Sequence, residues 1–166
     1  FVQMIEQACI INSWGKNIYV KIPVINSKGS FSGKVINKLS YKGIKLNITA
    51  VYTVAQVRKI LKCINKNYKT IISIFAGRMG DVGKNPVPII KESVRLTKKL
   101  KNVEILWAST REAYNYTQAK KCGCSIITMP SSIIEKISKF GKSYQQLSLD
   151  TVKKFLKDSQ NSNFKI

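Results

Sequence analysis

Histidine is absent from this chain of 166 residues, and acids are scarce, since 8 Asp and Glu stand against 29 Lys and Arg. Without imidazole the chain cannot build a Ser-His-Asp or Cys-His nucleophile, or a metal site that needs histidine. No apolar run approaches the ~18–20 residues of a membrane-spanning helix. The sequence therefore excludes histidine-dependent hydrolases and predicts no membrane-spanning helix.

Arginine is also rare, and this bears on the meaning of the formal charge of +21. A strongly basic chain is typical of nucleic-acid or phosphate binding. However, the basic residues are nearly all lysine, and Ile and Asn are abundant, which also fits the codon bias of an AT-rich genome. Because guanidinium grips phosphate and reads bases better than ammonium does, the composition favours codon bias over sequence-specific binding.

The four cysteines, Cys9, Cys63, Cys122 and Cys124, do not have the spacing of a metal-binding set. We expect them to be reduced thiols of a cytoplasmic protein. The residues at the start of the chain include no basic segment typical of a secretory signal, and they include no initiator Met. On this ground we expect the chain to be a fragment of a longer protein.

Short apolar runs alternate with amphipathic stretches along the chain, in the order αβαβαβαβαβαα. This order predicts a parallel α/β fold in a single domain over residues 1–166. No glycine-rich dinucleotide or P-loop motif follows a strand, although residues 77–88 form a glycine-rich loop. The expected strands are 18–24, 44–52, 70–75, 103–108 and 125–129. The expected helices include 4–14, 54–64, 88–100, 110–121 with Thr110 as N-cap, 131–140 with Ser131 as N-cap, and 150–160 with Val152, Phe155 and Leu156 facing inward.

Lys21 interrupts an otherwise apolar strand, between Val20 and Ile22. Desolvation lowers the pKa of an amine and frees it to attack a carbonyl as a Schiff-base nucleophile. An edge-strand lysine whose ammonium reaches water is the alternative, and the strand pattern alone leaves both open.

Other polar side chains fall toward the carboxyl ends of the later strands, where α/β barrels place their chemistry. Residues two apart on a strand share a face. Hydroxyl and guanidinium groups at the start of a helix can bind an anion. The set consists of Asn47 and Thr49 on the second strand, Ser73 and Phe75 on the third, Arg78 after it, and Ser109 and Arg111 after the fourth.

Five motifs resemble those of the transaldolase family, over essentially the whole chain. In order along the chain, they are similar to strands four to eight of that family's (β/α)8 barrel, and the segment 147–158 is similar to its C-terminal helix. The resemblance therefore implies an α/β fold of the TIM-barrel type that is incomplete in this chain. The motifs are VKIPV at 20–24, GIKLNITAVYT at 43–53, IISIFAGRMGD at 71–81, ILWASTRE at 105–112 and GCSIITMP at 123–130.

The resemblance also implies roles for the candidate residues. Lys21 matches the lysine that forms an imine with a ketose phosphate. Asn47, Thr49 and Ser73 match groups around the dihydroxyacetone moiety, and Thr49 resembles the hydroxyl that helps to hold the catalytic water. Arg78, Ser109 and Arg111 match the phosphate site. Phe75 stands where transaldolases carry Phe and fructose-6-phosphate aldolases carry Tyr.

The implied reaction transfers a dihydroxyacetone unit between a ketose phosphate and an aldose phosphate, as in the pentose phosphate pathway. It needs neither a metal nor an organic cofactor, because the imine is the electron sink. An aldolase-like lyase, an inactive barrel fragment and a basic phosphate- or RNA-binding protein are the alternatives.

The family's first three strands, with their catalytic aspartate and glutamate, have no counterpart in this sequence. Asp81 can instead pair with Arg78 or cap its loop, and Glu104 lies at the opposite end of its strand. We expect either a complementing N-terminal segment or a homo-oligomer. We expect sugar phosphates as partners, and neither a membrane nor nucleic acid, because the aromatic residues considered, Tyr19, Tyr52, Phe75 and Trp107, lie within strands.

Overall fold

The computed structural model describes residues 1–162. Within it the chain forms two compact units, Phe1–Pro130 and a second one that begins at Ser131. Each unit is described by itself below. The expectation of a single domain over residues 1–166 stays a prediction.

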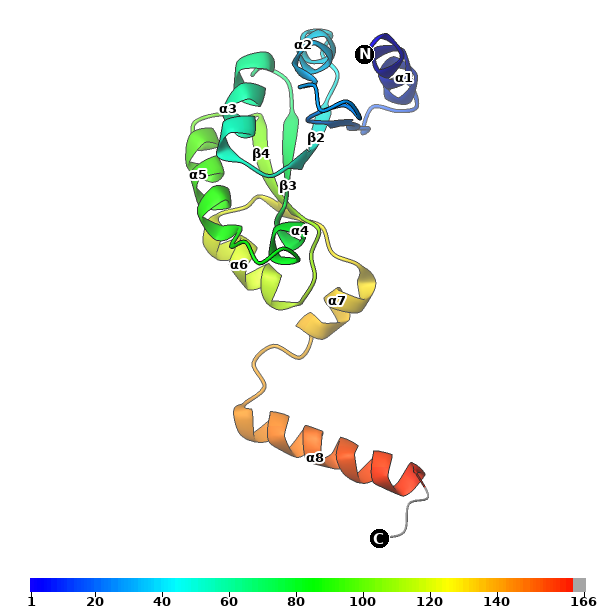
Figure 1. Ribbon diagram of the computed structural model, residues 1–166, viewed down its shortest axis with the longest axis vertical. Helices are drawn as coiled ribbons and strands as arrows, with labels where there is room; N and C mark the ends of the chain where they lie inside the picture. Colours follow the sequence, from blue (N-terminus) through cyan, green and yellow to red (C-terminus); the bar gives the residue numbers. More distant parts are fainter. Residues whose placement is uncertain (163–166) are drawn as a thin grey trace. The chain divides into compact units, whose positions relative to one another are not determined.

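The first unit is built on a parallel sheet of five strands in the order β1-β2-β3-β4-β5 (Figure 1). Each strand pairs with the next one along the chain, so that Lys21 lies opposite Asn47, and Asn47 opposite Ile71. The expected strands are confirmed, two of them with the expected bounds and three shortened at their ends. The strands are β1 Val20–Pro23, β2 Leu46–Val51, β3 Thr70–Phe75, β4 Val103–Ala108 and β5 Ile126–Ile127.

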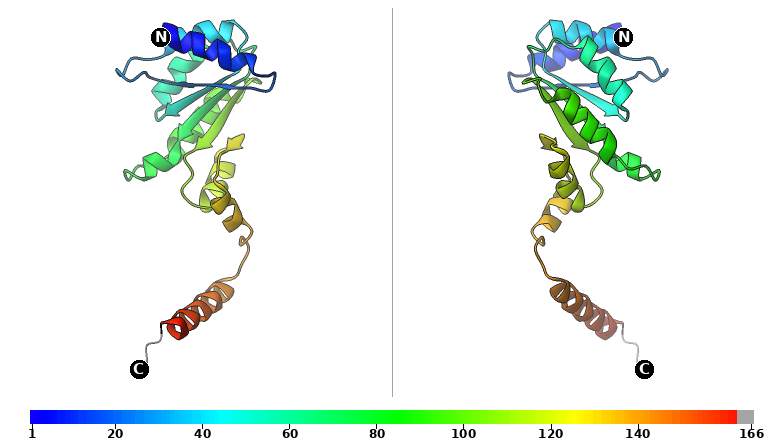
Figure 2. Two further views of the ribbon diagram at one scale, coloured as in Figure 1. Left: turned by 90° about the vertical axis from the view of Figure 1, so that its right-hand side faces the viewer. Right: turned by 90° about the vertical axis from the view of Figure 1, so that its left-hand side faces the viewer.

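Helices of this unit pack on one side of the sheet, as the views in Figures 1 and 2 show. Apolar residues recur at helical spacing on the sides that face the strands, which is why these segments fold onto the sheet. A capping box at Thr53 and Gln56 fixes the start of α3. The helices are α1 Val2–Ser13, α2 Gly33–Tyr41, α3 Val54–Cys63, the short α4 Ala76–Gly80, α5 Val87–Thr97 and α6 Tyr114–Cys122.

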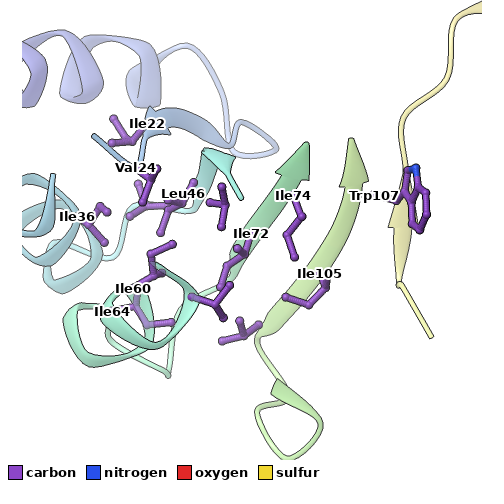
Figure 3. Packing of buried hydrophobic residues seen from close by; sticks show 14 of the residues in the cluster. Ile22, Val24, Ile36, Leu46, Ile60, Ile64, Ile72, Ile74, Ile105 and Trp107 are labelled. Carbon is purple, nitrogen blue, oxygen red and sulfur yellow. The ribbon is translucent and has the colours of Figure 1, made fainter. Parts of the chain in front are cut away.

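The main core lies between this helical layer and the sheet (Figure 3). Alternate strand residues such as Leu46, Ile72 and Trp107 point into it and are almost completely buried. They meet Ile36 of α2 and Ile60 of α3, which are also buried. Burial of branched aliphatic side chains on both sides of this layer explains why the strands read as nearly continuous apolar runs.

The opposite face of the sheet carries no helix among residues 1–130 and is part apolar, part polar. Ile71, Leu106 and Ala108 form a small second cluster on it. Lys21, Asn47 and Ser73 belong to the same face, because they alternate with residues of the main core. The candidate catalytic residues therefore lie on the side that would be the interior of a closed barrel. The unit is a partial TIM-type (β/α) barrel, as the sequence predicts.

The expected N-cap at Thr110 is wrong, because α6 begins only at Tyr114. The Thr110 hydroxyl instead donates a 2.6 Å hydrogen bond to the carbonyl of Thr128, beyond β5. The Asn115 side chain accepts from the backbone N–H of Arg111 and of Glu112, at 3.0 and 3.3 Å. A side chain inside the helix thus satisfies the donors that the predicted cap would have satisfied.

The second unit contains α7 Ser131–Ile137 and α8 Tyr144–Asn161. The helix expected at 131–140 is present as α7, but Ser131 is its first helical residue and therefore not the expected N-cap. Helix α8 is longer than the predicted 150–160, and a capping box of Ser143 and Gln146 fixes its start. Val152, Phe155 and Leu156 are exposed within the second unit, and the expectation that they face inward stays a prediction. In residues 1–162, no helix combines the length and the hydrophobicity that crossing a membrane requires.

Candidate active site at the carboxyl ends of the strands

Lys21 is the candidate nucleophile, and it is exposed on β1, which pairs only with β2. It borders a cavity of about 550 Å³ whose other walls include Met4 and Ala8 of α1. The interpretation of Lys21 as an edge-strand lysine in contact with water therefore describes its setting within residues 1–162. Because Lys21 is exposed, a solute can reach its side chain.

Asn47 and Ser73 are joined directly across neighbouring strands. The Ser73 hydroxyl donates a 2.7 Å hydrogen bond to Oδ1 of Asn47. Ser73 is only 2% exposed, so this bond satisfies a hydroxyl that has almost no access to water. The bond fixes the orientation of the Asn47 amide and leaves its Nδ2 hydrogens for another acceptor.

Thr49 lies two residues beyond Asn47 on β2, at an irregularity of the strand. The pairing of β2 with β3 shifts register after Ile48, and Ala50 has a left-handed backbone with φ of 59°. A non-glycine residue with this φ is uncommon and costs conformational energy. The Thr49 hydroxyl is buried and has no hydrogen-bond partner among the described residues. It is a free donor and acceptor on the candidate site.

Phe75 ends β3 and anchors two neighbours. Its ring meets that of Tyr52 edge to face, with ring centroids 6.0 Å apart. The guanidinium carbon of Arg78 lies 5.5 Å from the centroid of the Phe75 ring. This cation–π contact holds the arginine beside the aromatic pair. Tyr52, which the sequence argument placed only in the core, is thus part of the wall of the site.

Ser109 follows β4 with a left-handed backbone, φ 62°. Helix α4 approaches it so closely that a β-carbon at Gly77 would lie 1.6 Å from the Ser109 carbonyl oxygen. Only glycine permits this approach. The contact brings α4, which carries Arg78, against the segment that carries Ser109 and Arg111.

Arg111 forms an ion pair with Asp81, and not with a residue of its own segment. Its Nε lies 3.0 Å from Oδ1, and its Nη2 lies 2.5 Å from Oδ2. Hydrogen bonding to this guanidinium holds the pKa of Asp81 below its usual range, and the charge of Arg78 adds to the effect. The pair occupies the Nε–Nη2 edge of Arg111. The Nη1–Nη2 edge remains for a second bidentate acceptor.

Asp81 therefore does not pair with Arg78, the partner that the sequence argument considered for it. The loop after α4 folds back instead, and its Asp81 reaches Arg111 from β3's side of the site. A cavity of about 640 Å³ lies beside this arrangement, lined by Tyr52, Arg78, Met79, Asp81 and Lys84 among others. Its walls are mostly apolar, and Arg78 and Lys84 are the cationic side chains among them.

The structure thus groups the predicted residues into two sets, one within the strands on the helix-free face and one at the carboxyl ends of β3 and β4. One set contains the Asn47–Ser73 pair with Lys21 in register beside it, and the other contains Phe75, Arg78, Ser109 and Arg111. An amine and neutral hydrogen-bonding groups suit a carbonyl compound, and the guanidinium groups suit a phosphate.

Comparison with known proteins identifies the family of the chain. The family model described as transaldolase/fructose-6-phosphate aldolase matches residues 1–166. The chain is 32% identical to a probable transaldolase of Caldicellulosiruptor saccharolyticus over 157 residues. This match covers 93% of this chain and 66% of that protein. The chain is also 34% identical to probable transaldolase 2 of Listeria monocytogenes over 139 residues. This second match covers 81% of this chain and 59% of that protein.

A third relative, a probable transaldolase of Clostridioides difficile, is 29% identical over 164 residues, or 98% of this chain. The chain spans 59% to 66% of the length of the Listeria and Caldicellulosiruptor relatives that it matches. The family model extends over the strands, the carboxyl-edge residues and the helices described above. The chain belongs to the transaldolase/fructose-6-phosphate aldolase family.

Proposed function

We propose that this protein is a cytoplasmic transaldolase-type enzyme that moves a dihydroxyacetone unit from a ketose phosphate to an aldose phosphate. The observation that carries the proposal is the row formed by Lys21, Asn47 and Ser73 on the helix-free face of the sheet. The names of the relatives support the reaction type.

In the proposed reaction, the uncharged amine of Lys21 attacks the C2 carbonyl of the ketose and water leaves as the imine forms. The C3–C4 bond then breaks, and its electron pair moves toward the protonated imine to give an enamine. The C4 hydroxyl loses its proton, and the aldose phosphate departs. The enamine attacks the next aldose phosphate, and water releases the new ketose from Lys21.

The neutral groups of the row have defined tasks in this scheme. Nδ2 of Asn47, held in orientation by Ser73, donates to a hydroxyl of the bound three-carbon unit. The unpartnered Thr49 hydroxyl binds the water that enters and leaves at the imine carbon. The free edge of Arg111, together with Arg78 and Ser109, binds the phosphate group.

The proton from the C4 hydroxyl requires a base, and proton transfer contributes roughly 10²–10⁴-fold to such reactions. The resemblance assigns this task to an aspartate on a strand that has no counterpart in this sequence. We therefore propose that turnover needs a complementing N-terminal segment. That segment would pair with the free edge of β1, next to Lys21.

Trapping of the imine tests the proposal. The protein is incubated with fructose 6-phosphate, reduced with borohydride, and digested for mass spectrometry. We expect an adduct on Lys21 that Lys21→Met removes and that the exposed-lysine control Lys28→Met retains. Phe75 favours transfer over cleavage, so we expect turnover to require an aldose phosphate acceptor.

Two results would contradict the proposal. One is labelling spread over many lysines and unchanged in Lys21→Met. The other is absence of an adduct both from the 166-residue chain and from this chain supplied with the N-terminal part of the Caldicellulosiruptor relative. Release of free dihydroxyacetone without an acceptor would instead identify a lyase.

A further inference from the structure

The edge of the sheet at which the strands begin is strongly basic. Four loops lead from a helix into β1, β2, β3 and β4, at residues 14–19, 42–45, 64–69 and 98–102. They contain eight lysines and no acid. We call these four loops the amino-terminal loop surface. Its nearest acid along the chain is Glu104, half-buried within β4.

Contacts between the loops make this surface continuous. Nζ of Lys45 donates to the carbonyl of Lys16, which joins the first loop to the second. The Tyr68 ring packs against Gly43, where a β-carbon would lie 3.1 Å from it, which joins the second loop to the third. Nδ2 of Asn102 donates to the carbonyls of Lys66 and Asn67, at 3.3 and 3.2 Å, which joins the third loop to the fourth.

The lysines of this surface are available to a partner. Seven of the eight are exposed, and Lys45 is the half-buried one, 5.5 Å from the centroid of the Tyr19 ring. The ion pairs within residues 1–162 involve other cations. The exposed lysines are Lys16, Lys42, Lys66, Lys69, Lys98, Lys99 and Lys101.

Exposed aromatic rings lie in or next to the loops that carry these lysines. The sequence argument did not predict them, because it considered only aromatic residues within strands. Trp14 is 71% exposed at the end of α1, Tyr41 is 64% exposed at the end of α2, and Tyr68 is 42% exposed in the third loop. Lysines near helix C-termini are explained by the helix dipole alone, but exposed aromatic rings are not. Exposed aromatic rings among cations are the pattern of surfaces that stack nucleobases and bind phosphates.

We infer that the amino-terminal loop surface binds single-stranded nucleic acid. Neighbouring strands are about 4.8 Å apart, so four of them span about 14 Å, enough for a few nucleotides. Aliphatic residues of the loops, such as Ile44, Ile64 and Leu100, are buried or half-buried, so the surface lacks the aliphatic side chains that insert into a membrane. A duplex hides its base faces, whereas a single strand offers them to Trp14, Tyr41 and Tyr68.

Fluorescence anisotropy with a labelled single-stranded oligouridylate of ~20 nucleotides tests the inference over a range of salt concentrations. Lys42→Gln/Lys66→Gln/Lys69→Gln/Lys101→Gln is compared with an equal charge change elsewhere, Lys136→Gln/Lys139→Gln/Lys153→Gln/Lys157→Gln. We expect the first variant to reduce the slope of log Kobs against log salt by about 3, since each phosphate contact contributes ~0.7. The control set should change the slope little.

Tryptophan fluorescence measures stacking separately from charge. Trp14 is exposed and can meet a base, whereas Trp107 is only 1% exposed and cannot. We expect the oligouridylate to quench the fluorescence of Trp14, and Trp14→Ala to weaken binding about fivefold or more. Tyr144→Ala, which removes a ring that is 90% exposed on α8, is the matched control and should leave affinity unchanged. Quenching by oligothymidylate as well would support the inference equally.

Several outcomes would overturn the inference. Equal losses in the two lysine sets would mean that net charge alone attracts the strand. Binding of polyphosphate with the same affinity, and no quenching by the oligouridylate, would identify a site for polyanions in general. Quenching by phosphatidylserine vesicles alone would identify a membrane surface. None of these results bears on the imine at Lys21, which lies within β1 on the helix-free face and not in the four loops.

Discussion

The α-carbon of Gly77 faces the carbonyl oxygen of Ser109 at a distance that admits no side chain, since an added β-carbon would lie 1.6 Å from that oxygen. Through this contact α4 is packed against the end of β4. The packing brings Arg78, from the segment after β3, to the same side as Ser109 and Arg111, from the segment after β4. The phosphate-binding part of the candidate site therefore depends on a backbone-to-backbone approach.

Gly77→Ala should consequently destabilise the protein by about 3 kcal/mol or more, because backbone cannot move aside as a flexible side chain can. Gly80→Ala is the control in the same helix, since a β-carbon there meets nothing within 4 Å. We expect Gly80→Ala to be neutral or slightly stabilising. Urea unfolding followed by circular dichroism measures both. Equal stability of the two variants would contradict the close packing of α4 on Ser109.

The Asn47–Ser73 hydrogen bond should show strong coupling between the two residues. Asn47→Ala leaves a hydroxyl that is 2% exposed without its acceptor, at a cost of about 1–3 kcal/mol. Removal of both polar groups in Asn47→Ala/Ser73→Ala should cost less than the sum of the two single changes. A double-mutant cycle from urea unfolding gives the coupling. Additive effects would show that the two side chains act independently.

Stability should depend on pH through the Asp81–Arg111 pair. The Arg111 guanidinium lowers the pKa of Asp81 in the folded state, so the unfolded state takes up a proton more readily. The stabilisation by Asp81 is therefore complete above its usual pKa of about 3.9 and is lost as the pH falls through the lower, folded value.

The test compares the unfolding free energies of the wild type and Asp81→Asn at about pH 7 and about pH 3. We expect a small advantage of the wild type at the higher pH that is smaller at the lower pH and is reduced by salt, because both side chains are partly exposed. A difference independent of pH would mean that the carboxylate charge of Asp81 is not what stabilises this loop.

Helix α3 should depend on its capping box. Thr53 accepts a 3.1 Å hydrogen bond from the backbone N–H of Gln56, and the Gln56 side chain accepts from the backbone N–H of Thr53. Thr53→Ala removes one half of this pair and should cost about 1 kcal/mol. Thr53→Ser keeps the hydroxyl and should restore most of the loss. Thermal unfolding of the three proteins measures the effect, and failure of serine to rescue would argue against the cap.

Much of the fold could be predicted from the sequence, because period-two and helical apolar patterns are local. The strands at Thr70–Phe75 and Val103–Ala108 were predicted at their observed bounds. These strands are buried on both faces, so their apolar runs end where burial ends. The start of α6 was not predictable in this way, since Thr110 is by type as good an N-cap as Thr53, and a contact with Thr128 diverts its hydroxyl.

In the candidate site, too, some features could be predicted from the sequence and others could not. Alternation alone placed Asn47 and Thr49 on one face of their strand, and Ser73 and Phe75 on one face of theirs. The partner of Asp81 could not be assigned, because 30 residues separate it from Arg111 and the loop between β3 and α5 must fold back to join them. Tyr52 likewise becomes part of the site only through its ring contact with Phe75.

By itself the sequence determined the parallel α/β architecture and which residues within one strand share a face, since these follow from local patterns of apolar and polar side chains, and the family resemblance implied the order of the strands. The tertiary structure alone decided that Gly77 must meet Ser109, that Arg111 pairs with Asp81, and that Trp14, Tyr41 and Tyr68 come out among the lysines of one edge. The physical reason is that these relations depend on packing between segments far apart in the chain, which no local pattern encodes.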